Sequence, residues 1–312
     1  MAKPAQPSLF PEPAPPPVVP ASPHPDDVRL GAALPARFFF GTSSWSFPGW
    51  YGLVYGERGT VSRFSRHGLT AYASHPLLSA VGIDRSYYAP VPEQEYAAYR
   101  DQVLAARPDA RLVVKVLRDF TQPWGRVPRS KNPAFLDGPL ALSGSIGPAQ
   151  AALGDRAVHL VQFSPMGRGA GSPERFAERL DAFLAPLEGC RIAVELRDAA
   201  LFTPAYCEVL ARRSAIHCIN VLPEMPGPAE QRSALGDMPV LVRWLRSGPV
   251  AHDEAEALYD PYDRLQAEAP ALVEEVAAVL SGSTGEAILI VDNKAEGCAP
   301  LTLRRVAARL VG

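Results

Sequence analysis

The sequence lacks three features that would assign it to common classes of protein: closely spaced cysteines, long apolar runs and a large charge of one sign. Its four cysteines lie far apart without a Cys-x-x-Cys pair, which argues against a structural zinc site or a dithiol redox centre. No apolar run approaches the roughly 18 residues that a membrane-spanning helix needs. The N-terminal segment also lacks the basic and apolar regions of a signal peptide. We therefore expect a cytoplasmic protein without a membrane partner.

Charge is nearly balanced, with 31 lysines and arginines against 33 acidic residues. Because no long basic run is present, we expect no strong nonspecific binding to nucleic acid. Only four of the basic residues are lysines, and Lys115 is the one that lies within an apolar run. In so arginine-rich a chain, this position suggests a need for a compact, titratable ammonium group. The histidines show no metal-ligand spacing, so the sequence predicts no metal site and leaves the cofactor unknown.

Proline is concentrated near the N-terminus, where residues 1–36 hold 11 of the 33 prolines. Proline has no amide donor and a fixed φ, so such a segment is a poor candidate for a helix or a central strand. The sequence therefore predicts a disordered Pro/Ala-rich tail over residues 1–36, followed by one large domain over residues 37–312.

Eight short apolar runs in this domain are typical of parallel strands that are covered on both faces. We expect the strands at Phe38–Ser43, Ser79–Asp84, Leu112–Val116, Val158–Phe163, Ile192–Leu196, Ile216–Val221, Val240–Leu245 and Ile288–Asp292. Helical patterns lie at Glu93–Arg107, Pro173–Leu187, Pro204–Arg213, Tyr262–Leu280 and Leu301–Leu310. This alternation predicts an α/β fold, a (β/α)8 TIM-type barrel. A doubly wound sheet is disfavoured because no Gly-x-Gly-x-x-Gly follows the first strand.

The most informative segment is Arg191-Ile-Ala-Val-Glu-Leu-Arg-Asp, an apolar strand that ends in a carboxylate and a guanidinium. Glu195 and Arg197 are two residues apart and therefore share one face of the strand. In barrels of this type the active site lies at the C-terminal ends of the strands. We interpret Glu195 and Lys115 as candidate catalytic residues. The candidate substrate-binding residues at the same rim are Ser43, Trp45, Asp84, Tyr88, Gln162, Arg197, Arg243 and Asn293.

Each of these residues also has a structural interpretation. Glu195 could belong to an ion pair that joins two strand ends, and Lys115 could extend its ammonium to the rim as part of ordinary packing. Trp45 and Tyr88 could stack on a sugar or a base, or could simply fill the core. A neutral amide such as Asn293 could orient a polar ligand or satisfy backbone groups.

Four segments resemble the signature segments of one family, DUF72 (YecE-like). They are Gly41-Thr-Ser-Ser-Trp-Ser-Phe-Pro-Gly-Trp-Tyr-Gly, Val194-Glu-Leu-Arg-Asp, Val242-Arg and Asp292-Asn-Lys-Ala-Glu-Gly. They occur in the family's order over roughly residues 38–310. The resemblance implies a TIM-type barrel and no established activity. By position it supports, as signature residues, Gly41, Thr42, Ser43, Trp45, Trp50, Glu195, Arg197, Arg243 and Asn293.

The second strand departs from the family. The family pattern Glu-x-Asn-Ser-Thr-Phe-Tyr is replaced by Gly82-Ile-Asp-Arg-Ser-Tyr-Tyr. The family carboxylate is therefore missing at Gly82, and Asp84 stands at the asparagine position. A mechanism that needs both carboxylates is in doubt for this chain, and a specialised or an inactive branch of the family is an open interpretation.

The N-terminal segment carries a second signal, Gln6-Pro-Ser-Leu-Phe10. It resembles the short peptide by which bacterial replication and repair proteins dock on the DNA sliding clamp, with Pro7 in place of the usual leucine. Gln6, Leu9 and Phe10 would be the docking residues, because an extended tail can present them to a groove. The alternative is an ordinary apolar pair in a proline-rich segment.

These observations leave three functions open. The first is an enzyme of hydrolase or isomerase type that acts on an anionic, phosphate-bearing or sugar-like substrate, with Glu195 as base or ligand. Lys115, Arg197 and Arg243 would bind the charge, and we expect them to make the pocket electropositive and selective for a small anionic ligand. The second is a DNA-repair or replication accessory protein recruited to the sliding clamp by residues 6–10. The third is a noncatalytic ligand-binding barrel, which the missing carboxylate at Gly82 favours.

Overall fold

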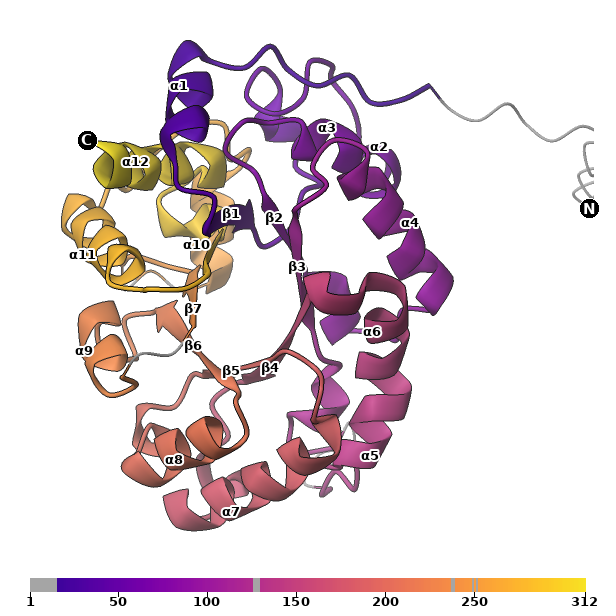
Figure 1. Ribbon diagram of the computed structural model, residues 1–312, viewed down its shortest axis with the longest axis vertical. Coiled ribbons are helices and arrows are strands. Elements are labelled where there is room, and N and C mark those ends of the chain that lie inside the picture. The colour runs from indigo at the N-terminus through magenta and orange to yellow at the C-terminus, as the bar shows by residue number, and fades with distance from the viewer. Residues whose placement is uncertain (1–15, 126–129, 237–238, 249, 251) are drawn as a thin grey trace, which may run out of the picture.

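Eight parallel strands form a closed barrel in the computed structural model, which describes residues 16–125, 130–236, 239–248, 250 and 252–312 (Figure 1). The strands are β1 (Phe38–Thr42), β2 (Ala80–Ile83), β3 (Arg111–Lys115), β4 (Ala157–Phe163), β5 (Ile192–Leu196), β6 (Ile216–Val221), β7 (Val240–Trp244) and β8 (Ala287–Val291). They pair in chain order, and β8 closes on β1 with Phe38 opposite Ala287 and Thr42 opposite Val291. The predicted TIM-type barrel is confirmed, because each short apolar run forms one strand.

Helices surround the barrel (Figure 1). They are α1 (Pro25–Ala33), α2 (Val61–His67), α3 (Leu69–Ala73), α4 (Glu93–Leu104), α5 (Gly138–Ala141), α6 (Gly147–Leu153), α7 (Pro173–Leu184), α8 (Pro204–Arg212), α9 (Pro228–Ser233), α10 (His252–Tyr259), α11 (Pro270–Ser281) and α12 (Ala299–Val311). The helix expected from Tyr262 begins only at Pro270. The preceding amides of Gln266 and Ala267 instead donate to the Glu296 carbonyl, at 2.7 and 3.1 Å. None of the helices in the described residues is long and apolar enough to span a bilayer.

The N-terminal segment is structured further upstream than the sequence predicts. Residues 25–33 form α1, which packs against α12 near the C-terminus (Figure 1). Pro25 occupies the first turn of α1, where its missing amide costs nothing. Asp27 then accepts hydrogen bonds from Arg304 Nε and Nη2 at 2.6 and 2.7 Å. Residues 25–33, which were expected to belong to the disordered tail, are therefore helical, while residues 1–15 lie outside the described residues.

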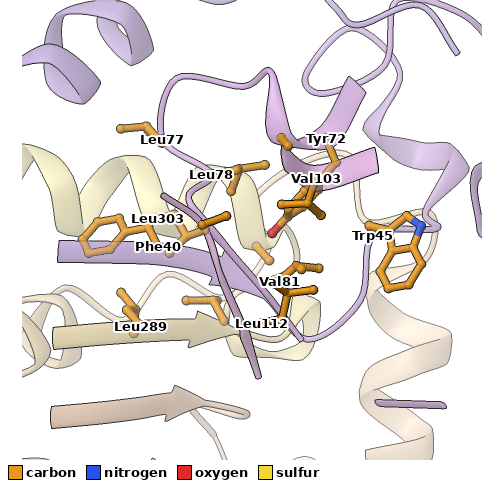
Figure 2. Close-up of a cluster of buried hydrophobic side chains, with 14 of the residues drawn as sticks. Phe40, Trp45, Tyr72, Leu77, Leu78, Val81, Val103, Leu112, Leu289 and Leu303 are labelled. Atoms are coloured by element: carbon orange, nitrogen blue, oxygen red, sulfur yellow. The ribbon is translucent and has the colours of Figure 1, made fainter. Parts of the chain in front are cut away.

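The core has an inner and an outer layer because successive strand residues point to opposite sides. Inside the barrel, Phe39, Val113 and Leu160 belong to one apolar cluster. At its N-terminal end Glu286 is paired with both Arg111 and Arg191. Outside, strand and helix side chains form the larger cluster shown in part in Figure 2, which includes Phe40, Trp45, Tyr72, Leu77, Leu78, Val81, Val103, Leu112, Leu289 and Leu303. Other polar residues lie at the C-terminal ends of the strands.

Candidate functional site

Strand periodicity places the charged residues at the C-terminal mouth of the barrel. Lys115 lies two residues after the inner-layer Val113, and Glu195 lies two residues after Ala193. Arg243 stands in the same relation to Leu241 on β7. All three side chains therefore follow the inward-facing side of their strands.

The charges at the mouth form one continuous network. Arg197 Nε donates to Glu195 Oε1 at 2.7 Å, and Arg243 Nη1 donates to Glu195 Oε2. Arg243 Nη2 also lies 3.6 Å from Asp84 Oδ2, to which Lys115 Nζ approaches within 2.8 Å. Two carboxylates thus join three cations from four strands or strand ends. The structural ion pair considered for Glu195 and Arg197 is present as part of this network.

Glu195 is the buried centre of the network, with a fully buried side chain. Burial alone would raise its pKa, but Arg243, Arg197 and Lys115 outweigh burial and lower the pKa to about 2. Arg243, whose side chain is 1% exposed, has its pKa raised by Glu195 and Asp84 against the effect of burial. Both Glu195 oxygens accept a guanidinium donor, so this carboxylate is suited to holding Arg197 and Arg243 in place.

Lys115 has a different environment. Its side chain is 7% exposed, and burial lowers the pKa of its ammonium against the attraction of Asp84. The ammonium lies 5.4 Å from the centre of the Tyr87 ring. Ser86 Oγ donates to the Lys115 carbonyl at 2.6 Å and fixes the backbone at this strand end. Lys115 is therefore a positioned cation with one carboxylate in direct contact.

A cavity of about 640 Å³ opens above the network, within the size range of small-molecule sites. We call it the rim cavity. It is lined by Asp84, Tyr87, Tyr88, Lys115, Gln162, Ser164, Pro165, Arg197, Leu222, Glu224, Arg243, Leu245, Arg246, Glu256, Asp292 and Lys294. The described part of the chain contains no group of three or more histidine, cysteine, aspartate or glutamate side chains that could hold a metal ion.

The rim cavity is not as electropositive as the sequence suggests. Five of its lining side chains are cationic and four are carboxylates, and Glu195 lies beneath them. Two further pairs balance the outer wall: Arg246 contacts Glu224, and Lys294 Nζ lies 3.5 Å from Asp292 Oδ1. The three cations expected to make the pocket electropositive therefore face several carboxylates, because sequence proximity to the rim does not reveal which carboxylates will pair with them.

The structure brings most of the candidate residues together. Asp84, Tyr88, Lys115, Gln162, Arg197 and Arg243 line the rim cavity, and Glu195 contacts two of them from below. Gln162 accepts from Arg197 Nη2 at 3.0 Å and is thereby tied to the network. The residues missed by the sequence reading include Ser164, Arg246 and Lys294. Their signal was position alone, since each lies within a few residues after a strand.

Besides Glu195, three candidates in the part of the chain that the structure describes do not line the rim cavity. Trp45 belongs to the outer core (Figure 2), where its Nε1 donates to the Phe64 carbonyl at 2.9 Å. Asn293 Oδ1 accepts from the amide of Ala299 at 2.9 Å and caps the start of α12. Ser43 is buried, with its amide bonded to the Val291 carbonyl at 3.1 Å. Gln6, Leu9 and Phe10 lie outside the described residues.

Gly82 explains how the barrel accommodates the missing carboxylate. A Cβ atom at this position would lie 2.8 Å from the Ser43 carbonyl oxygen and 2.9 Å from Ser43 Cα. The end of β1 therefore approaches β2 too closely for any side chain at Gly82. Asp84, two residues further along, supplies the carboxylate on this side of the rim cavity.

Comparison with known proteins agrees with the fold. The family model "Protein of unknown function DUF72" matches residues 39–312. Crystal structures of DUF72 proteins from Enterococcus faecalis and Thermotoga maritima superpose with TM-scores of 0.58 and 0.52, at 18% and 15% identity. Each superposition covers 88% of this chain, and it covers 95% of the Enterococcus faecalis chain and 98% of the Thermotoga maritima chain. No curated protein matches the chain. The chain belongs to the DUF72 family of barrel proteins.

Proposed function

We propose that this protein is an enzyme of hydrolase or isomerase type that acts on a small, sugar-like substrate carrying one anionic group. The observation that carries the proposal is the placement of Lys115 and Asp84, 2.8 Å apart, on the wall of the rim cavity. A buried lysine with a lowered pKa and a carboxylate neighbour, in a cavity of ligand size, is an arrangement typical of functional sites.

Arg197 and Lys115 are the residues suited to binding the anionic group. The Arg197 side chain is 27% exposed and lines the rim cavity. Its Nε and Nη2 atoms bond to Glu195 and Gln162, which orients the guanidinium. Among the described residues no hydrogen bond involves Nη1, so this atom can meet a ligand oxygen. The balanced charge of the wall supports recognition of a single acidic group together with several hydroxyls, and is unsuited to a polyanion.

Asp84 and Lys115 are the residues suited to proton transfer. Asp84 is 28% exposed, whereas Glu195 is fully buried with both oxygens occupied. In the proposal Asp84 accepts a proton from the substrate and Lys115 donates one, since burial makes its ammonium a better acid than an exposed lysine. Glu195 has a positioning role: it holds Arg197 and Arg243.

Thermal denaturation with added ligands tests the binding step. Phosphate, sulfate and a set of hexose phosphates should raise the melting temperature, with the largest rise for a sugar phosphate. Arg197→Ala should remove most of this rise. The control is Arg309→Ala, which removes an exposed arginine on α12 paired with Glu274, and it should respond as wild type does. An equal response of wild type and Arg197→Ala would contradict the proposed anion site.

A noncatalytic ligand-binding barrel is the second candidate. It is favoured by Gly82, where the structure leaves no room for the family carboxylate. The two functions differ in what happens to a bound ligand. Mass spectrometry of a stabilising ligand after long incubation with wild type and with Asp84→Asn separates them. Unchanged ligand in both samples supports the binding protein, and conversion by wild type alone supports the enzyme.

A further inference from the structure

A second cavity of about 350 Å³ adjoins the rim cavity. It lies beside η3 (Arg118–Phe120), in the segment that follows β3, and its lining includes Arg118, Asp119, Gln122 and Trp124. Tyr87 and Ser164 line both cavities, so they form a shared wall. We call this second space the Trp124 cavity.

Trp124 presents an exposed aromatic face beside this cavity. It is 49% exposed, which is unusual for so large an apolar side chain. The ring lies against η6 (Gly167–Gly169): a Cβ atom on Gly169 would be 3.0 Å from Trp124 Nε1 and 2.5 Å from Pro123 Cγ. Close contact with a residue that has no side chain therefore positions the indole while leaving it accessible to a ligand.

The segment that carries Trp124 is held by its own hydrogen bonds. The side-chain Nδ2 of Asn132 donates to the carbonyls of Asp119 and Gln122. The backbone amide of Asn132 donates to the Pro123 carbonyl at 3.0 Å. The Gly125 amide bonds to the Ser130 carbonyl at 2.8 Å. These bonds position Trp124 before a ligand binds, which lowers the entropy cost of binding.

The shared wall is polar. The Tyr87 hydroxyl accepts a hydrogen bond from Gln122 Nε2 at 3.2 Å and lies 3.4 Å from Ser164 Oγ. Its ring faces Lys115 in the rim cavity and makes an edge contact with Tyr88, at 5.3 Å between ring centres. A ligand that crosses this wall would meet hydroxyl and amide groups, with an aromatic ring on either side.

The charge of the Trp124 cavity decides which ligand fits. Its described lining holds one arginine and one aspartate, Arg118 and Asp119. A phosphodiester chain needs an excess of cations along its path, and the described lining of the Trp124 cavity holds equal numbers of cations and carboxylates. A sugar ring needs an aromatic face for its C–H groups, and paired donors and acceptors for its hydroxyls. Both are present.

We propose that the Trp124 cavity is a second sugar subsite, so that the substrate is a glycoside or oligosaccharide of at least two rings. One ring, carrying the acidic group, occupies the rim cavity, and the next ring stacks on Trp124. The linkage between the rings then crosses the wall at Tyr87. The proposal rests on the proposed function of the rim cavity, which it extends by naming the substrate class.

Matched ligands of one and two rings test the proposal on the full-length protein. The probes are glucose 6-phosphate with trehalose 6-phosphate, and galacturonate with digalacturonate, measured by titration calorimetry. Wild type should bind the two-ring member of one pair about tenfold more tightly, as expected for one stacked ring with its hydrogen bonds. Trp124→Ala should lose this gain and keep the one-ring affinity. Trp124→Phe should keep part of it, and Tyr51→Ala, which removes an exposed tyrosine outside both linings, should keep all of it.

Acrylamide quenching of tryptophan fluorescence provides an independent measurement. Trp45, Trp50 and Trp244 are 4%, 0% and 0% exposed, so the quencher reports mainly on Trp124. A two-ring sugar should protect the fluorescence, and a one-ring sugar should not. Equal affinity for both members of each pair, or a gain that survives in Trp124→Ala, would overturn the second subsite. Stronger protection by AMP or a thymidine pentanucleotide would also overturn the second subsite, because Trp124 would then be assigned to stacking on a nucleobase.

The two proposals can fail separately. Protection of Trp124 by a two-ring sugar, without any effect of Arg197→Ala on its affinity, supports the subsite and contradicts the anion site. One-ring binding that depends on Arg197, without a two-ring gain, contradicts only the subsite. Absence of binding for every sugar probe contradicts both.

Discussion

Lys115 Nζ lies 2.8 Å from Asp84 Oδ2, across the adjacent ends of β2 and β3. The contact joins a nearly buried ammonium to a carboxylate that is 28% exposed to the rim cavity. Glu195 stabilises the same region from below, through Arg197 and Arg243. The site thus separates a buried carboxylate that organises the cations from an accessible one that can meet a ligand. The predictions below follow from this division.

Removal of the buried carboxylate should destabilise the barrel. Glu195→Ala leaves Arg243 buried without its main partner, and breaking a buried pair in this way costs about 3–5 kcal/mol. Urea denaturation measures this change in the free energy of unfolding. Glu274→Ala is the control, because it breaks an exposed pair with Arg309 worth about 0–1 kcal/mol. Similar losses in the two variants would contradict the central structural role of Glu195.

Docking of α1 should depend on pH through Asp27. Burial alone would raise the pKa of Asp27, but hydrogen bonds from His75 and Arg304 lower it to about 2. A lowered carboxyl pKa gives stability that is complete above the unfolded value of 3.8 and is lost as pH falls toward about 2. Asp27→Asn should therefore be less stable at neutral pH, by about 1.5–3 kcal/mol for charge-assisted hydrogen bonds. Urea midpoints measured from pH 7 down to about 2 should converge for the two proteins; a constant difference would be inconsistent with this role.

Substitutions of Trp45 and Tyr88, the two aromatic candidates, should have different effects. Trp45→Phe leaves the Phe64 carbonyl without its buried donor, at a cost of about 1–3 kcal/mol in unfolding free energy, and should not change ligand affinity. Tyr88→Ala removes a side chain that is 66% exposed on the rim cavity, and should weaken ligand binding with little loss of stability. Chemical denaturation and ligand titration of both variants check this. Loss of ligand affinity in Trp45→Phe without loss of stability would contradict the structural role of Trp45 and indicate a role in ligand binding.

The barrel could be predicted from the sequence because each strand is a separate apolar run with polar residues after it. Lys115 and Arg197 could be assigned to the rim because period-two alternation fixes the direction of a strand side chain. The pairing of Arg243 with Asp84 and Glu195 could not be predicted, since it depends on the register of strands that are distant in the chain.

Other parts of the structure depend on contacts that composition conceals. The Pro-rich composition hid α1, whose stability comes from the bond between Asp27 and Arg304, 277 residues away. Trp45 and Asn293 follow β1 and β8 as expected for rim residues. Their side chains, however, turn toward the outer core and the start of α12. There Trp45 hydrogen-bonds to the Phe64 carbonyl and Asn293 to the Ala299 amide. The Trp124 cavity could not be predicted from the sequence pattern, because an irregular segment after β3 forms it.

Binding to the sliding clamp remains a prediction from the sequence of residues 6–10. Full-length protein should bind the cognate clamp with micromolar affinity, since a short peptide segment loses chain entropy on docking. Leu9→Ala combined with Phe10→Ala should abolish binding without changing the melting temperature. Titration calorimetry checks both statements. Absence of saturable binding at about 100 μM, roughly −5.5 kcal/mol, would remove the sequence-based connection to DNA.

A crystal structure with the most stabilising sugar phosphate tests the central claim most directly. The account predicts that the ligand occupies the rim cavity, with an anionic oxygen at hydrogen-bonding distance, about 2.7–3.2 Å, from Lys115 Nζ or Arg197 Nη1. A hydroxyl of the same ligand should contact Asp84. A ligand bound outside the rim cavity, or one whose acidic group contacts neither Lys115 nor Arg197, would contradict the account.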